Sequence, residues 1–543
     1  WTDGEEVIQN WTVLEASPIF TDPERAQIVS ALYGTYAANA LDNYLKVARD
    51  SAPRWNHEIF PALSIVAGGD YFLRYYGLAE AASWKHLGER IFTGNTSTIS
   101  LDEGSDYLMH VPMVNIDYAM ATGQLEFMTR SLRPSADLNV LMIDNLGTMA
   151  GGGDTYPFGY SGPYSWGHSQ VMYAASWLYR DPVYRVLLER AKNGPFPDQR
   201  MTDLDYPIHR YIVEDLPGED ELNPLNYPTV RAYPVEQGVY EDLAGQEQAP
   251  LDVEQADTFH KLTFREGFGL DDSYLIMDGF SAGRHGHQDG NAILNYTANG
   301  RLFLTDRDYI ENTPEHHSGL VVVKDGEQGK KPPLAKLEWA ADIEGTALAR
   351  SVVPNYNGTD WTRSIISPDG SFYIIYDDVD VKESGSYMLK NLWQTLGTPS
   401  IRGERFEAEQ QGVKMTIDSM DNSELRTHDR YGHFIKYWKT QYNYPYADRE
   451  TVLSQVRGEQ HYEAGERAEF INVLSSVKNG ENGIKTKRIN ESTLEISRTS
   501  EKWLAVYAAV NSNPFASDGK FHLIGEGQLL AAEATWVRIG DHT

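Results

Sequence analysis

Four histidines between residues 285 and 317 are the side chains whose type and spacing most clearly suit chemistry. His285 and His287 are two residues apart, so on a β-strand they point to the same face. An antiparallel sheet can bring Asp306 and His317 alongside them. His287, Asp306 and His317 would then supply two nitrogens and one carboxylate oxygen, a ligand set that suits one Zn²⁺ ion. The alternatives are that His316 replaces His317, or that these are strand histidines without a ligand.

A second group of candidate residues recurs in the first half of the chain at a nearly constant interval. His57, His110 and Tyr164 follow one another at steps of 53 and 54 residues. A hairpin of two helices with their turns has about this length. We therefore expect the three side chains at equivalent ends of neighbouring helical hairpins, where they can converge.

The first 215 residues, which carry this second group, are predicted to form helices. Thr21-Asp22-Pro23-Glu24 supplies an N-cap, a first-turn proline and acidic first-turn charge. Apolar residues at helical spacing follow it, which predicts a helix of about seven turns. The same periodicity predicts further helices at 58–67, 70–92, 105–122, 135–149, 166–179 and 181–192, with breaks at Gly68-Gly69 and Gly151-Gly152-Gly153.

The pattern changes to that of β-strands from about residue 258. Runs such as 273–277 and 371–376 suit strands, and Asn299-Gly300 and Asp369-Gly370 are typical turn signals between them. Strands without intervening helices predict an antiparallel sandwich of several layers. The fold class is therefore multidomain α+β, with a helical domain at 1–235 and a β-sandwich at 236–543.

The segment 283–326 resembles the central part of the heparinase II/III-like polysaccharide lyases. The shared features are a His-x-His-x-Asp motif, a strand with a Gly turn, an Asp before a Tyr, and a His before a Val-rich strand that ends in Asp-Gly: His285, His287, Asp289, Asn299-Gly300, Asp306, Tyr309, His317 and Asp325-Gly326. One departure is Asp306-Arg307-Asp308, where the family usually has Asp-x-Gly. The resemblance implies an incomplete α/α toroid followed by a multilayer antiparallel β-sandwich that contributes catalytic and metal residues.

The resemblance also implies residues for β-elimination in the helical half. The family has an Asn-His pair at a helix start, matched by Asn56-His57, and a Ser-x-x-Tyr segment, matched at Tyr164. The family's pair usually lies one hairpin before its tyrosine, whereas Asn56-His57 lies two hairpins before Tyr164. His110 has the expected interval but no preceding Asn. Both histidines are therefore kept as candidates.

β-Elimination of a uronate unit makes three demands on these groups. A base must remove the C5 proton, the adjacent carboxylate must be neutralised, and the departing O4 must be protonated. A histidine with a pKa of about 6.5 suits the base, and Tyr164 with a pKa of about 10 suits the acid. Asn56 or a histidine such as His285 would neutralise the carboxylate. The residues expected to bind the sugar rings and their charges are Arg284, Trp55, Tyr160, Trp166 and Tyr309.

The charge and composition of the chain exclude some classes of binding partner. The formal net charge of −31 over 543 residues repels phosphate backbones and anionic lipid heads, so no nucleic acid and no membrane-surface partner is expected. No run of apolar residues approaches the roughly 18 that a spanning helix needs, so no membrane insertion is expected either. No cysteine is present, which excludes disulfides and thiolate metal sites. The first residue is Trp1 and no basic leader follows it, so a secreted or periplasmic protein with its export signal removed is expected.

Two other functions compete with the lyase. A glycoside hydrolase on an α/α toroid would use paired carboxylates, with Asp102, Glu103, Asp106 and Asp154 as candidates. A carbohydrate-binding protein without catalysis would need only the aromatic side chains and the sandwich. For a lyase, ulvan, alginate, glucuronan and glycosaminoglycans are all open as the anionic polysaccharide substrate, and the oligomeric state is open as well.

Overall fold

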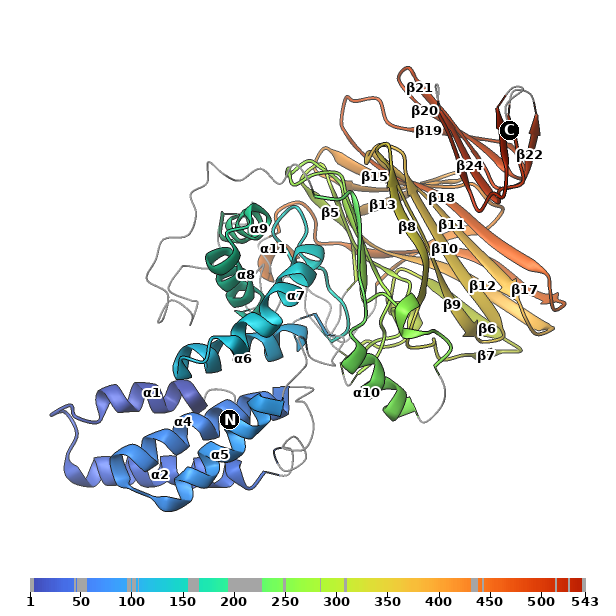
Figure 1. Ribbon diagram of the computed structural model, residues 1–543. Coiled ribbons are helices and arrows are strands. Elements are labelled where there is room, and N and C mark those ends of the chain that lie inside the picture. The colour runs from blue at the N-terminus through green and yellow to red at the C-terminus, as the bar shows by residue number, and fades with distance from the viewer. Residues whose placement is uncertain are drawn as a thin grey trace.

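The computed structural model divides into a helical part and a β-sheet part (Figure 1). It describes residues 4–42, 45, 56–94, 99, 104–105, 107–154, 166–193, 227–247, 251–283, 285–306, 310–430, 438–441, 444–512, 515–525 and 528–539. Helices occupy the described residues up to 193, and antiparallel strands dominate from 230 onward. The predicted fold class, helices followed by a multilayer antiparallel sandwich, is confirmed.

The helical part consists largely of hairpins. Three pairs of successive helices pack against each other: α4 with α5, α6 with α7, and α8 with α9. The bounds of the helices in this part are α1 (Gly4–Leu14), α2 (Asp22–Ala40), α4 (Asn56–Tyr76), α5 (Ala79–Gly94), α6 (His110–Thr122), α7 (Glu126–Met142), α8 (Trp166–Tyr179) and α9 (Pro182–Asn193), with a 3₁₀ turn η1 (Tyr107–Met109). His57 lies in the first turn of α4 and His110 opens α6, one hairpin later.

The Thr21 cap predicted from the sequence begins α2. The Thr21 side chain accepts from the backbone N–H of Glu24, whose carboxylate accepts in return from the backbone N–H of Thr21. The predicted seven turns are too many, because α2 ends at Ala40 after 19 residues.

The predicted break at Gly68-Gly69 is wrong, because α4 runs through both glycines. A Cβ at Gly68 would overlap the ring of Tyr36 in α2, and one at Gly69 would lie 2.7 Å from the carbonyl oxygen of Ala81 in α5. These glycines therefore let neighbouring helices approach closely. The chain turns instead at Gly77, which has a φ of +65°. The helix predicted at 135–149 is also misplaced, since α7 begins at Glu126 and ends at Met142.

The β part contains four antiparallel sheets among the described residues. The first has ten strands: β1 (Val230–Tyr233), β2 (Lys261–Arg265), β3 (Tyr274–Asp278), β4 (Ile293–Ala298), β5 (Arg301–Thr305), β12 (Gly385–Leu396), β17 (Glu450–Tyr462) and β16 (Glu424–Asp429) in spatial order, with β6 (Leu320–Lys324) beside β12 and β7 (Glu327–Gln328) beside β6. The second has eight: β13 (Thr398–Arg402), β14 (Arg405–Gln410), β15 (Val413–Ser419), β18 (Arg467–Lys478), β11 (Phe372–Val381), β10 (Thr359–Ser367), β9 (Thr346–Tyr356) and β8 (Lys336–Ile343).

Two smaller sheets complete the C-terminal end. One contains β19 (Lys485–Asn490), β20 (Thr493–Arg498), β21 (Glu501–Val506), β24 (Phe521–Gly525) and β25 (Gln528–Ala532), and the other contains β22 (Val510–Ser512), β23 (Phe515–Ser517) and β26 (Val537–Ile539). Two helices accompany the sheets, α10 (Gln237–Glu247) and α11 (Trp438–Gln441). The strand β1 already belongs to the ten-stranded sheet, although it precedes residue 235.

Three hydrophobic cores separate four layers. Helices pack on one face of the ten-stranded sheet, where Tyr274 and Ile276 join the helical core. The opposite face of that sheet packs on the eight-stranded sheet, around Trp361 and Trp393. The outer face of the eight-stranded sheet carries the five-stranded sheet. The C-terminal strands therefore lie on the side of the sandwich away from the helices, as Figure 1 shows.

Arg265 in β2 anchors the helical part to the sandwich. Its guanidinium is buried and donates to the carbonyl oxygens of Val140, at 3.1 Å, and Ile143, as well as to the side chain of Asn145. These carbonyls lie in the last turn of α7 and at its C-cap, where backbone oxygens lack helical partners and carry the negative end of the helix dipole. Tyr274 in β3 adds a hydrogen bond to the carbonyl oxygen of Leu141. The junction between the two parts therefore combines an apolar core with specifically paired polar contacts.

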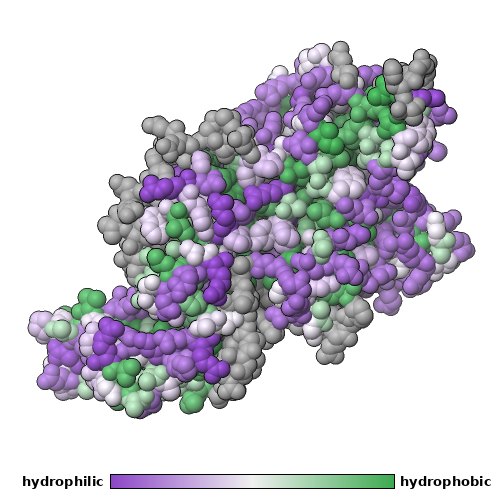
Figure 2. Space-filling view, viewed as in Figure 1, coloured by the Kyte–Doolittle hydropathy of each residue, from purple (hydrophilic) through white to green (hydrophobic). Residues whose placement is uncertain are grey.

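The surface of the molecule is largely polar. Figure 2 shows a face that is mostly hydrophilic, with hydrophobic side chains in separate patches. Within the described residues, no helix combines the length and the apolar character that crossing a membrane requires.

Candidate active site at the domain junction

Asp154 connects the helical part to the histidine motif of the sandwich. Its two carboxylate oxygens lie 3.0 Å from Nδ1 of His285 and 2.8 Å from Nε2 of His287, and the backbone N–H of Ile310 donates to it at 2.6 Å. Burial alone would raise the pKa of Asp154, but the hydrogen bonds from His285, His287 and Ile310 outweigh it and hold the pKa well below its usual range. Asp154 is therefore an ionised acceptor that orients both imidazoles.

A glycine lets the two segments meet. Gly153 has a φ of +60°, and a Cβ there would lie 2.5 Å from the carbonyl oxygen of His285. The backbone N–H of Asp154 donates to that same carbonyl at 2.8 Å. The Gly151-Gly152-Gly153 run predicted as a break between helices thus also brings the loop against the sandwich.

Tyr107 fixes the ring of His285 from the helical side. The two rings are stacked, with centroids 3.8 Å apart and planes 11° from parallel. The His285 side chain is 21% exposed. One imidazole thus rests on the helical part while remaining accessible to another molecule.

His110 lies beside this pair at the start of α6. Its ring contacts the rings of Tyr107 and Phe60, each with a centroid distance of 5.2 Å. Burial lowers the pKa of His110 to about 3, with smaller contributions from the nearby His168 and His285. Its Nδ1 is buried and has no hydrogen-bond partner among the residues that the structure describes. His110 is therefore neutral at pH 7, as a general base must be.

His168 in α8 is a further buried imidazole of the group. Its Nε2 donates to the carbonyl oxygen of Ser105 at 2.7 Å, and its Nδ1 contacts the side chain of Asn139. Burial lowers the pKa of His168 to about 4. Because both of its nitrogens are engaged, His168 helps to hold the wall of the site.

Asn56 and His57 occupy the first turn of α4. The side chain of Asn56 accepts from the backbone N–H of His57 at 2.9 Å. Phe60, whose ring contacts His110, lies four residues after Asn56 and so on the same face of the helix. The pair thus lies about one turn before the α4 residue that contacts His110.

The other predicted residues of the site cannot be placed in the same way. Trp166 opens α8, but its side chain is not among the described parts of the structure. The remaining ones lie outside the described residues altogether: Tyr164, Trp55, Tyr160, Arg284 and Tyr309, together with the acids Asp102, Glu103 and Asp106.

A buried group of metal-type ligands lies next to Asp154. Ligand atoms of Asp289, Asp306 and His317 all lie within 4.8 Å of one another, and all three residues are buried. Nδ1 of His317 is 2.8 Å from Asp306, whereas His316 pairs with Glu311 at 3.0 Å. In the described residues, Nε2 of His317 and Oδ1 of Asp289 have no hydrogen-bond partner. Two carboxylates, one imidazole and two orphaned buried atoms fit a divalent cation.

This group differs from the predicted ligand set by one residue. Asp306 and His317 are present, but Asp289 takes the position that the sequence suggested for His287. His287 is instead turned to Asp154, and its ring centroid lies 5.4 Å from that of His317. The His-x-His-x-Asp motif lies in the loop between β3 and β4 and not on a strand, so the expectation that His285 and His287 share one face of a strand is wrong.

Three functional candidates were missed by sequence reasoning. Tyr107 and His168 have no motif of their own, and only the packing of η1 and α8 brings them to His110. The buried ammonium of Lys331 has no hydrogen-bond partner among the described residues and lies over the rings of Trp361 and Tyr356; burial lowers its pKa to about 8, although Asp289 and Asp306 act in the opposite direction. Nothing in the sequence around Lys331 indicates that position.

The arrangement suits proton abstraction better than acid-catalysed hydrolysis. A glycosidase needs a carboxylic acid whose pKa is raised, so that it is protonated when the leaving group departs. Asp154, the hydrolase candidate within the described residues, has its pKa shifted in the opposite direction. A neutral imidazole with a free nitrogen, beside a second imidazole held by a carboxylate, is what removal of a carbon-bound proton requires.

Solved structures of polysaccharide lyases share this fold. A crystal structure of heparinase III matches with a TM-score of 0.59 at 13% identity, covering 99% of this chain and 75% of that chain. The heparinase III BT4657 gene product matches with a TM-score of 0.58 at 14% identity, covering 96% and 72%. Heparan sulfate lyase HepC from Pedobacter heparinus matches with a TM-score of 0.56 at 12% identity, covering 96% and 73%.

Comparisons of the sequence alone give no such match. No protein-family model matches it, and no curated protein does either. The heparinase-like resemblance is therefore confirmed at the level of the fold, over nearly the whole chain.

Proposed function

We propose that this protein is a polysaccharide lyase that cleaves a uronic-acid-containing anionic polysaccharide by β-elimination. The observation that carries the proposal is the group of His110, His285 and Asp154 at the domain junction of a heparinase III-type fold. The substrate class follows from the chemistry, because a uronate carboxylate acidifies its C5 proton. One of the similar structures is a heparan sulfate lyase, so glycosaminoglycans are among the first polymers to test.

The proposed roles divide proton transfer from charge neutralisation. His110 takes the C5 proton, while the C5–H electron pair forms the C4=C5 double bond and the C4–O4 bond breaks. Tyr164 donates a proton to the departing O4. Asn56, His57 and His285 hydrogen-bond the uronate carboxylate, which stabilises the charge that develops on it. The aromatic and cationic residues Trp55, Tyr160, Trp166, Arg284 and Tyr309 are proposed to hold the neighbouring sugar units.

The experiment that tests this function is incubation with uronate polymers. Ulvan, alginate, glucuronan and heparan sulfate are each mixed with the protein, and the ultraviolet absorbance of the conjugated C4=C5 product is followed together with new reducing ends. A lyase produces both signals. A hydrolase produces reducing ends without the absorbance, and a binding protein produces neither; either result contradicts the proposal.

Tyr164→Phe tests the proposed acid. It keeps the ring and removes the phenolic proton, so turnover should fall by about 10²–10⁴ while binding changes little. Turnover near that of the unchanged protein would remove Tyr164 from the mechanism.

We also propose one zinc ion, held by Asp289, Asp306 and His317. When bound, it would supply positive charge that ties three segments of the sandwich together beside His285. Elemental analysis of protein purified without chelators should find about one equivalent per chain. Asp289→Asn should lose the metal and His287→Gln should keep it; the reverse would favour the ligand set with His287.

A secreted or periplasmic location fits these proposals, because a polysaccharide is too large to diffuse across a membrane. Digestion of such a polymer therefore takes place outside the cytoplasm.

A further inference from the structure

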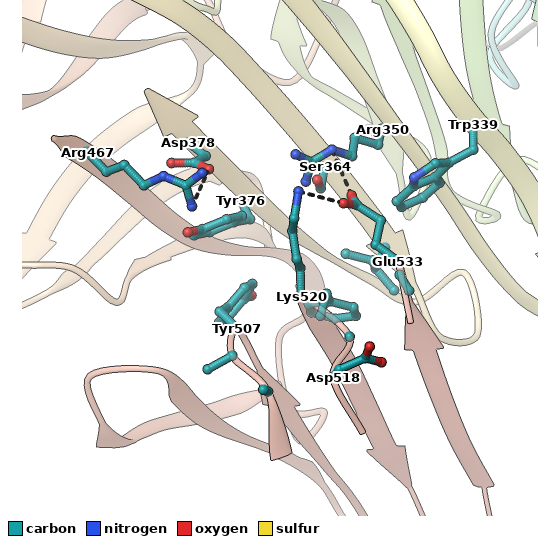
Figure 3. A pocket seen from close by; sticks show the side chains of 16 residues that line it. Trp339, Arg350, Ser364, Tyr376, Asp378, Arg467, Tyr507, Asp518, Lys520 and Glu533 are labelled. Carbon is teal, nitrogen blue, oxygen red and sulfur yellow. Dashed lines mark ion pairs between the residues drawn. The ribbon is translucent and has the colours of Figure 1, made fainter. Parts of the chain in front are cut away.

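A second polar cavity lies far from the histidines, between the outer face of the eight-stranded sheet and the C-terminal strands. Its volume is about 270 Å³ (Figure 3). One wall is a row of directly paired residues across β8, β9, β10 and β11: Trp339, Arg350, Ser364 and Tyr376. The opposite wall comes from Tyr507, the start of β24 and the end of β25. The ten-stranded sheet and the sandwich core separate this cavity from the helices.

The cavity contains polar atoms that lack partners. Asp378 is 6% exposed, and its Oδ1 has no hydrogen-bond partner among the described residues; the same is true of the Tyr507 hydroxyl. Burial raises the pKa of Asp378 to about 6, although Arg467 acts in the opposite direction. Buried polar atoms without partners are rare and costly, so a carboxylate oxygen and a hydroxyl in one cavity indicate a ligand that donates hydrogen bonds.

The charges of the lining disfavour an anion. Three cations face three carboxylates in the lining: Arg350, Arg467 and Lys520 against Asp378, Asp518 and Glu533. Each cation is already paired. Arg350 and Lys520 both pair with Glu533, at 3.1 and 2.8 Å. Arg467 pairs with Asp380 at 2.6 Å and lies 3.8 Å from Asp378. An anionic group would have to displace a carboxylate, whereas hydroxyl groups can add to these pairs.

The aromatic side chains supply a flat apolar surface. Tyr376 and Tyr507 stack on each other with centroids 4.5 Å apart. Trp339 lines the cavity and is also packed against the core between the eight- and five-stranded sheets. The part of its indole that lines the cavity suits a ligand that has both an apolar face and a polar rim.

We propose that this cavity is a second saccharide-binding site, which takes one uncharged sugar ring. The ring packs its C–H face on Trp339, and its hydroxyls donate to Asp378 and bond to Tyr507. The size agrees, because cavities for drug-sized ligands measure about 300–1,000 Å³ and this one is smaller. The site is independent of the proposed lyase chemistry, and would hold an uncharged unit of a polysaccharide while the domain junction acts on another.

Ligand-observed NMR on the full chain tests the proposal. The probes are the methyl glycosides of glucose, galactose, rhamnose and N-acetylglucosamine, each at about 10 mM, which suffices for a Kd of about 1 mM. At least one glycoside should bind. Asp378→Asn, which is nearly isosteric, and Trp339→Ala, at a partly exposed position, should each weaken that binding about tenfold or more. Thermal unfolding of both variants establishes that they are folded.

Matched controls separate this site from the domain junction. His285→Ala should leave glycoside binding unchanged, and Trp339→Ala should leave formation of the C4=C5 product from short oligosaccharides unchanged. Absence of binding by all four glycosides overturns the proposal. So does loss of binding in His285→Ala, or binding of choline instead of the glycosides, which would indicate a site for an organic cation.

Discussion

Two buried polar clusters of this protein show opposite degrees of hydrogen-bond saturation. In the sandwich core, the fully buried Arg363 binds both oxygens of Asp377, at 2.7 and 3.1 Å, and also the carbonyl oxygens of Asn291 and Ser318. Asn391 adds a further hydrogen bond to Asp377. At the domain junction, by contrast, Nδ1 of His110 has no partner among the described residues.

The contrast separates stability from function. A saturated network gains nothing from another molecule, so its residues contribute to the folded state alone. An orphaned, neutral imidazole carries a desolvation cost that a substrate can relieve. Substitutions at the two clusters should therefore affect different measurements.

The largest expected effect is on activity at the junction. His110→Ala should lower kcat/KM on the uronate polymer by about 10²–10⁴, because it removes the proposed base, and should leave thermal stability almost unchanged. Steady-state kinetics and a melting curve are the two measurements. His57→Ala is the matched variant that decides between the two histidines, since the one with the larger loss is the base.

The next effect is on stability in the sandwich core. Asp377→Asn keeps the shape of the side chain but leaves the Arg363 charge unpaired, which should lower the free energy of unfolding by about 3–5 kcal/mol. Glu424→Gln, in an exposed pair with Arg426, is the control and should leave the free energy of unfolding almost unchanged. Denaturant unfolding measures both. Equal losses in the two variants would contradict the argument from saturation.

A pH-dependent effect distinguishes the junction histidines from exposed ones. The pKa of His168 in the folded protein is about 4, below its ordinary value of 6.5. The folded state is therefore not penalised above pH 6.5, and it loses stability relative to the unfolded state as the pH falls from 6.5 towards 4, because only the unfolded chain takes up the proton. The cost should reach about 1.4 kcal/mol for each pH unit in that window. His168→Gln should therefore gain stability relative to the unchanged protein on acidification. A constant difference between pH 7 and pH 5 would show that His168 titrates normally.

The smallest expected effect concerns the ring that supports His285. Tyr107→Leu removes a stacked contact worth about 0.5–1.5 kcal/mol. We expect kcat to fall several-fold with KM nearly constant, because His285 loses its orientation. Tyr107→Phe keeps the stacking and should restore most of the rate. If Phe is as defective as Leu, the hydroxyl rather than the ring is what matters.

Local patterns in the sequence predicted the order of elements well. The Thr21 capping box, the helical periodicity and the Asn-Gly and Asp-Gly turns depend on neighbouring residues, and they gave the helical half followed by the sandwich. The same reasoning failed at Gly68-Gly69, because those glycines serve the contacts of α4 with Tyr36 in α2 and Ala81 in α5. A sequence pattern cannot distinguish a glycine that ends a helix from one that admits a neighbour.

The sequence by itself determined the residue types of the candidate site: a His-x-His-x-Asp motif on one side, and histidines at hairpin intervals on the other. Only the tertiary structure decided their partners. It turned His287 to Asp154, put Asp289 beside Asp306 and His317, and placed Tyr107 on His285. The physical reason is that these contacts join residues more than 100 positions apart, or loops at the ends of β4, β5 and β6 whose positions are set by the sheet as a whole. Partner choice of this kind depends on the packing of α6, α8 and the ten-stranded sheet, which no local pattern encodes.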